Sequence, residues 1–110
     1  MKTEIIEGLW LDERQEIALT KLVELSGIPE AELLELADCG AIVPIDPSAK
    51  PKQWTFTAKW IVTVRTAWRL RNSFELGPHD VALVVTLLDR IQDLEAQLRK
   101  LRAQLSPRIP

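Results

Sequence analysis

A repeat of apolar positions, spaced alternately three and four residues apart, runs through the last part of the chain. This spacing is that of the a and d positions of a heptad, so it predicts one long helix with a narrow apolar seam. The repeat is too long for packing on one small domain, which predicts self-association or pairing with one partner helix. The seam residues are Val84, Leu87, Ile91, Leu94, Leu98, Leu101 and Leu105.

The charges beside this seam allow two orientations of a helix pair. In an antiparallel pair, Glu95 of one chain could face Arg102 of the other. In a parallel pair, Arg90 could instead meet Glu95. The orientation therefore stays open, as does the alternative that the helix folds back on its own domain.

Two short amphipathic segments within residues 18–44 predict a helix-turn-helix. The first helix ends at Ser26-Gly27, Pro29 suits the first turn of the second, and Gly40 is a natural stop for it. Both helices have one apolar face, as a helix that packs on a core requires. These faces consist of Leu19, Leu22, Val23 and Leu25 in the first helix and of Leu33, Leu34, Leu36 and Ala37 in the second.

Short extended segments lie on both sides of the helix-turn-helix. Loose alternation in residues 4–18 predicts an N-terminal strand or hairpin. Residues 44–53 hold three prolines and two lysines, which predicts a loop. Residues 54–57 (WTFT) alternate as a short strand would, and Ile42-Val43 before the loop could pair with them. Such a pair would form a small β wing.

A third helix is expected from Thr57, a good N-cap, to about Phe74. Gly77-Pro78 then begins the long helix. The fold class is therefore mainly α, with residues 1–76 as one domain and residues 77–110 as the long helix and a short tail. The buried face of the third helix is expected to consist of Trp60, Ile61, Val64, Ala67 and Trp68.

The charges of this 110-residue chain are strongly segregated. Residues 1–46 carry eleven acidic and three basic side chains, whereas residues 47–110 carry five acidic and eleven basic ones. Such asymmetry often marks a surface that meets an oppositely charged partner. The alternative is that the two halves of one fold simply attract each other.

The second helix of the helix-turn-helix has the wrong charge for DNA. A DNA-reading helix presents Arg, Lys, Asn or Gln, but residues 26–46 contain no Lys or Arg, and carboxylates repel phosphates. We therefore expect a protein partner, although acidic residues in a first turn also suit the helix dipole alone. The candidate binding residues are Glu24 on the first helix and Glu30, Glu32, Glu35 and Asp38 on the second.

Residues with catalytic or metal-binding chemistry are few. Cys39 is the single cysteine and His79 the single histidine, so we expect no enzyme activity, no metal site and no cofactor. Cys39 is expected to pack as a small apolar residue, and His79 to lie in solvent at a helix N-terminus. No apolar run approaches the roughly 20 residues that span a bilayer, and no signal peptide opens the chain. We therefore expect a cytoplasmic location without a membrane partner.

The order of these elements resembles the MerR superfamily: a helix-turn-helix, a wing, a third helix and a long dimerising helix. Within it, the chain is similar to the CbpM branch of chaperone modulators. The segments that carry the resemblance are LVELSGIPEAELLELADCGAIVP, WTFT, AWRLR and LGPHDVALVVTLLDRIQDLEAQLRKLRAQL. The last segment is the most specific, because many transcription factors share the helix-turn-helix alone.

This resemblance implies a MerR-like winged fold and a homodimer that inhibits a co-chaperone. In that family the modulator binds the J-domain of a CbpA-type, DnaJ-like co-chaperone and keeps it from engaging DnaK. J-domains present a basic helix, which an acidic surface would match. The alternative function is a MerR-like transcriptional regulator, in which nucleic-acid phosphates would contact Lys50, Lys52, Arg65 and Arg69.

Overall fold

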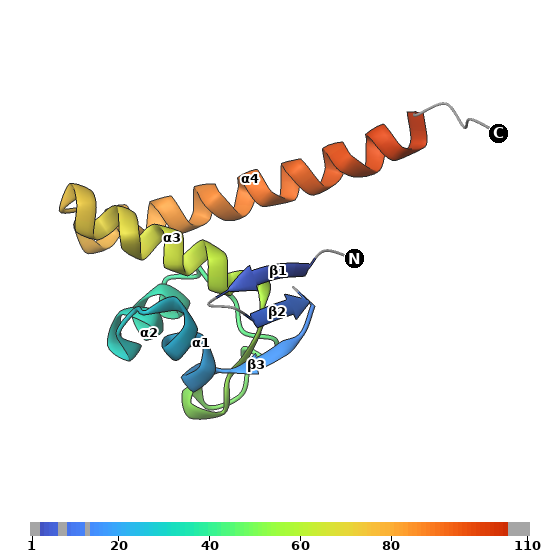
Figure 1. Cartoon of the computed structure of the whole chain (residues 1–110). Helices are drawn as coiled ribbons and strands as arrows, with labels where there is room; N and C mark the ends of the chain where they lie inside the picture. The colour runs from blue at the N-terminus through green and yellow to red at the C-terminus, as the bar shows by residue number, and fades with distance from the viewer. Residues whose placement is uncertain (1–2, 7–8, 13, 106–110) are drawn as a thin grey trace.

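The computed structural model describes residues 3–6, 9–12 and 14–105. These residues form a mainly helical fold, as predicted, in which a long helix extends beyond a smaller body (Figure 1). The tail, residues 106–110, lies outside the described residues. The elements are β1 (Thr3–Ile6), β2 (Leu9–Asp12), β3 (Glu16–Ala18), α1 (Leu19–Ser26), α2 (Glu30–Asp38), a 3-10 turn (Pro51–Gln53), β4 (Thr55–Thr57), α3 (Lys59–Phe74) and α4 (Pro78–Leu105).

The strands form two separate antiparallel pairs. β1 pairs with β2, which confirms the N-terminal hairpin. β3 pairs with β4 and places Ile17 opposite Phe56. Both of these side chains are buried, and cross-strand apolar pairs stabilise short sheets. This pairing therefore joins the segment before α1 to the segment before α3.

The predicted wing pairing of Ile42-Val43 with residues 54–57 is wrong, because β4 pairs with β3. On the other edge of β4, the Thr55 carbonyl accepts a hydrogen bond from the Ile45 N–H at 2.8 Å. Residues 41–46 contain bends but no strand. Ile42 is completely buried, so this stretch turns into the core instead of running alongside β4.

The helix-turn-helix follows the prediction closely. Gly27 ends α1 with φ +80°, and Gly40 follows α2 with φ +83°, a conformation that favours glycine. Beyond Gly40, the Ala41 N–H donates to the Leu36 carbonyl at 2.9 Å, which satisfies a helix-end acceptor. Pro29 lies one residue before α2 instead of in its first turn.

The predicted cap of α3 is wrong by one residue. Thr57 is the last residue of β4, and Ala58 occupies the N-cap position without a side-chain hydrogen bond. The Ala58 N–H donates to the Gln15 carbonyl at 2.8 Å, so the chain stays tied to the segment before β3 up to the start of the helix. The predicted apolar face is confirmed for four residues, while Trp68 is half-buried. These four buried residues are Trp60, Ile61, Val64 and Ala67.

The start of α4 packs against the body of the molecule. Val81 and Val85 are buried, and α4 runs beside α3 (Figure 1). Lys59 at the start of α3 forms an ion pair with Asp89 of α4, with 3.4 Å between Nζ and Oδ1. The helix has 28 residues, about 42 Å at an ideal rise, and the molecule is 53 Å long.

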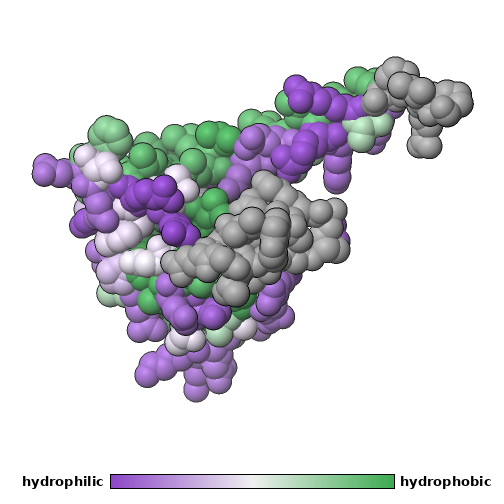
Figure 2. All heavy atoms as spheres, in the orientation of Figure 1, coloured by the Kyte–Doolittle hydropathy of each residue, from purple (hydrophilic) through white to green (hydrophobic). Residues whose placement is uncertain are grey.

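The apolar seam of α4 does not fold back onto its own domain. Val84 is half-buried, but the six later seam residues are exposed, from 46% at Leu94 to 73% at Leu105. Leu83 beside them is exposed as well. In Figure 2 hydrophobic residues gather along the upper edge of the molecule, over α4. None of the helices in the described part of the chain has the length and apolarity needed to cross a membrane.

Replacement of Phe56 by Ala is expected to destabilise the fold by about 3–5 kcal/mol, because it empties a fully buried site on β4, opposite Ile17 of β3. The measurement is the free energy of unfolding in urea. Phe74→Ala is the matched control, since Phe74 is 69% exposed, and it should change stability by less than about 0.5 kcal/mol. Equal decreases in the free energy of unfolding of both variants would contradict this account of the core.

Candidate protein-binding surface

The acidic residues of α2 point away from the core. Leu33 and Leu36 form the buried side of this helix, so the carboxylates at the other positions face solvent or the edge of the core. Glu32 is half-buried, whereas Glu30, Glu35 and Asp38 are exposed. The predicted acidic surface is therefore accessible along the whole of α2.

Among the described residues, Glu24 on α1 is the candidate carboxylate that has an ion pair. Its Oε1 lies 3.9 Å from Nζ of Lys21, one turn earlier on the same helix. Both side chains are largely exposed, and such pairs are weak. Glu24 is thus less available to an outside cation than Glu35 or Asp38.

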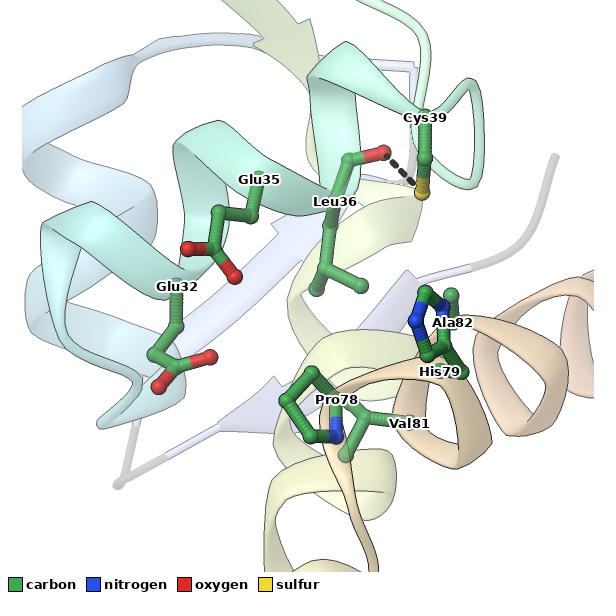
Figure 3. Close-up of a pocket in the computed structure, with 8 residues that line it drawn as sticks. All are labelled: Glu32, Glu35, Leu36, Cys39, Pro78, His79, Val81 and Ala82. Carbon is green, nitrogen blue, oxygen red and sulfur yellow. Dashed lines mark hydrogen bonds between the residues drawn. The ribbon is translucent and has the colours of Figure 1, made fainter.

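A hollow of about 200 Å³ lies between α2 and the start of α4 (Figure 3). In this view the carboxylates of Glu32 and Glu35 stand to the left, Leu36 of α2 stands above the centre, and Pro78 of α4 stands below it. Sequence patterns do not predict this site, because no local signal brings residues 78–82 next to α2. The lining residues are Glu32, Glu35, Leu36, Cys39, Pro78, His79, Val81 and Ala82.

Cys39 and His79 line this same hollow. The expectation that Cys39 packs as an apolar residue is wrong, because it is exposed at the C-cap of α2. Its Sγ donates to the Leu36 carbonyl at 3.4 Å. His79 is exposed in the first turn of α4, as predicted. Within the described ranges, no three His, Cys, Asp or Glu side chains are grouped to hold a metal ion.

A second hollow, of about 370 Å³, lies further along α4. Val43 and Ile45 at its edge are 52% and 49% exposed, although both are large apolar residues. Lys59 also lines it but is paired with Asp89. The remaining lining residues are Gly40, Ala41, Thr57, Trp60 and Thr86.

The candidate phosphate contacts are not a set of free cations. Lys50, Lys52 and Arg69 are exposed. Arg65 is half-buried and is engaged in an interaction within the chain. Arg71 on the same helix lies over the ring of Trp68, with 4.7 Å between its guanidinium carbon and the ring centre. Part of the basic charge of α3 is therefore used in contacts within the chain.

The apolar seam and the two hollows lie on different faces of α4. Ala82, Thr86 and Asp89 line the hollows and are spaced four and three residues apart, so they share one face. On an ideal helix, the mean direction of this face is roughly 140° from that of the seam. A partner helix on the seam would therefore leave the hollows open.

Comparison with known proteins agrees with this architecture. Residues 17–103 match the family model described as MerR HTH family regulatory protein. The chain is also similar to the chaperone modulatory protein CbpM of Escherichia coli O1:K1, O81 (strain ED1a) and O139:H28 (strain E24377A). Each is 32% identical over 88 residues, which cover 80% of this chain and 85% of the relative. The chain therefore belongs to the CbpM family of chaperone modulatory proteins, within the MerR-like helix-turn-helix superfamily.

Proposed function

We propose that this chain is a cytoplasmic chaperone modulator that binds the J-domain of a CbpA-type, DnaJ-like co-chaperone and inhibits its engagement of DnaK. The acidic surface of α2 would provide the contact. The observation that carries the proposal is a helix-turn-helix whose second helix exposes carboxylates where a DNA reader presents cations. The CbpM name of its relatives supports the chaperone partner.

Electrostatics supports a basic partner in two ways. Residues 26–46 contain several carboxylates and no Lys or Arg, so the negative field around α2 is not cancelled by its own segment. Such a field steers a cationic protein toward the surface and disfavours acidic competitors. Inhibition would then follow from occupancy, since a basic J-domain helix covered by α2 is no longer available to DnaK.

We further propose that two chains associate through the seam of α4. Exposed apolar side chains that extend over about 30 Å of helix are typical of an unpaired coiled-coil face. Both parallel and antiparallel pairing remain compatible with this face. In either arrangement the dimer would present two acidic surfaces, because α2 lies away from the seam.

Charge reversal on α2 should weaken binding to the J-domain. The triple variant Glu32→Lys, Glu35→Lys and Asp38→Lys is expected to raise Kd by at least about 30-fold, since 2 kcal/mol or more is typical of lost close charge pairs. Titration calorimetry measures the effect at low and moderate salt. The matched control reverses Glu16, Glu75 and Asp93, which are exposed at other places and change the net charge equally. A folded α2 variant with unchanged Kd would refute the acidic-surface mechanism.

A single charge in the seam should prevent dimer formation. Leu94→Asp buries a carboxylate in the paired helices and is expected to yield monomers in sedimentation equilibrium, while the wild-type chain forms dimers. Gln97→Asp on the same helix is the control, because Gln97 is exposed and off the seam. Monomeric wild-type protein, or a dimer that survives Leu94→Asp, would contradict the proposed seam.

The alternative function is DNA binding, favoured by the helix-turn-helix family match and by the exposed Lys50, Lys52 and Arg69. We expect no binding to duplex DNA even at about 50 mM salt, where phosphate contacts are strongest. Fluorescence anisotropy with a labelled duplex measures this directly. Saturable binding that falls steeply with added salt would favour the regulator and place phosphate contacts on these residues.

A further inference from the structure

The two hollows along α4 are lined by neighbouring residues. Ala82 lines the first and Thr86 the second, one helical turn later, and the Thr86 hydroxyl donates to the Ala82 carbonyl at 2.9 Å. On the opposite wall, the consecutive residues Cys39 and Gly40 line the first and the second hollow. We call the two together the α2–α4 groove. From Pro78 to Asp89 it follows about 16 Å of α4, the length of three turns of a helix.

The two ends of this groove differ in chemistry. Glu32 and Glu35 stand at the end near the start of α4. At the other end, Val43 and Ile45 expose about half of their apolar surface, and the buried Trp60 lies at the bottom. Exposed apolar side chains that border a hollow are typical of an interaction site. A complementary ligand therefore has cations at one end and apolar side chains at the other.

The charge of the groove favours a cationic occupant. Among the residues that the structure describes, Lys59 is the one Lys or Arg that lines either of the two hollows, and Asp89 neutralises it at 3.4 Å. Glu32 and Glu35 have no such cation among the described residues that line their hollow. Since long Lys and Arg side chains carry an apolar stem, they can lie along Leu36 while their charge reaches these carboxylates.

We propose that the α2–α4 groove binds one basic amphipathic helix of the J-domain partner, with its cations at Glu32 and Glu35 and its apolar residues at Val43 and Ile45. This inference rests on the proposed function. It goes further by placing the contact between two helices instead of on the open face of α2. It also makes the start of α4, with Pro78 and Ala82, part of the recognition surface.

Alkylation of Cys39 tests the proposal without any mutation. The chain has one cysteine, it is exposed, and it lines the groove where the two hollows meet, so its reaction rate with N-ethylmaleimide reports on this site. Mass spectrometry follows this rate in the free chain and in the presence of the purified J-domain, at a concentration that calorimetry shows to be saturating. We expect saturation to slow the reaction at least about 10-fold, because the bound helix covers the thiol.

The other outcomes of this experiment separate the two proposals. An unchanged alkylation rate in a saturated complex would overturn the groove and leave J-domain binding intact, at another surface. An absence of calorimetric binding would overturn both. Protection of Cys39 by the chain itself, as its concentration rises without J-domain, would assign the groove to a second copy. The basic and apolar end of α4 would then be the occupant, and the proposal would fail.

Paired variants test the chemistry of each end. Glu35→Lys and Ile45→Asp lie in the groove and should each raise the Kd for the J-domain at least about 10-fold. Their controls are Glu16→Lys on β3 and Phe74→Asp on α3, both exposed and outside the groove, which should change Kd less than about 2-fold. Thermal melts confirm folding of all four. If affinity for the J-domain falls with Glu35→Lys but not with Ile45→Asp, the groove is overturned in favour of a purely electrostatic surface.

Discussion

The burial of Val81 and Val85 fixes the rotation of α4, and the surfaces of the molecule depend on it. These two residues are four apart and lie on one face of the helix, which packs against the body. Once that face is fixed, the seam must point into solvent, and Ala82 and Thr86 must point toward the end of α2. The same packing contact therefore leaves one apolar stripe open for another helix and closes one wall of the α2–α4 groove.

The helix-turn-helix provides the other wall of that groove, and its second helix gives this wall an acidic character. Its geometry is set by glycine-terminated helices and by Leu33 and Leu36 on the buried side of α2, features compatible with a DNA-binding relative. Its exposed positions carry carboxylates, however, which repel phosphates and attract cationic proteins. A fold shared with regulatory proteins can thus present a surface suited to a protein partner, because the core and the surface are separate sets of residues.

Two expectations from local pattern fail because a partner distant in sequence takes the same backbone or side chain. Ile42-Val43 has strand-like composition, yet Ile42 is buried in the core, and the strand that pairs with β4 is β3. Thr57 is a good cap by type but lies within the β4 ladder. Cys39 follows an apolar helix face but falls beyond its last buried turn. For Ile42 and Thr57 a contact distant in sequence outweighs a local preference, whereas Cys39 is exposed because of its place at the end of α2.

The sequence by itself determined the elements and their chemistry: the heptad seam, the glycine stops, the buried face of α3 and the acidic character of α2. These properties follow from residue type and from spacing over one or two turns, so no distant contact is needed to specify them. Only the tertiary structure decided which strand pairs with β4, that the seam stays exposed, and that Pro78 faces Glu32 across a hollow. Such juxtapositions depend on how elements far apart in the chain pack around one core, which local patterns do not encode.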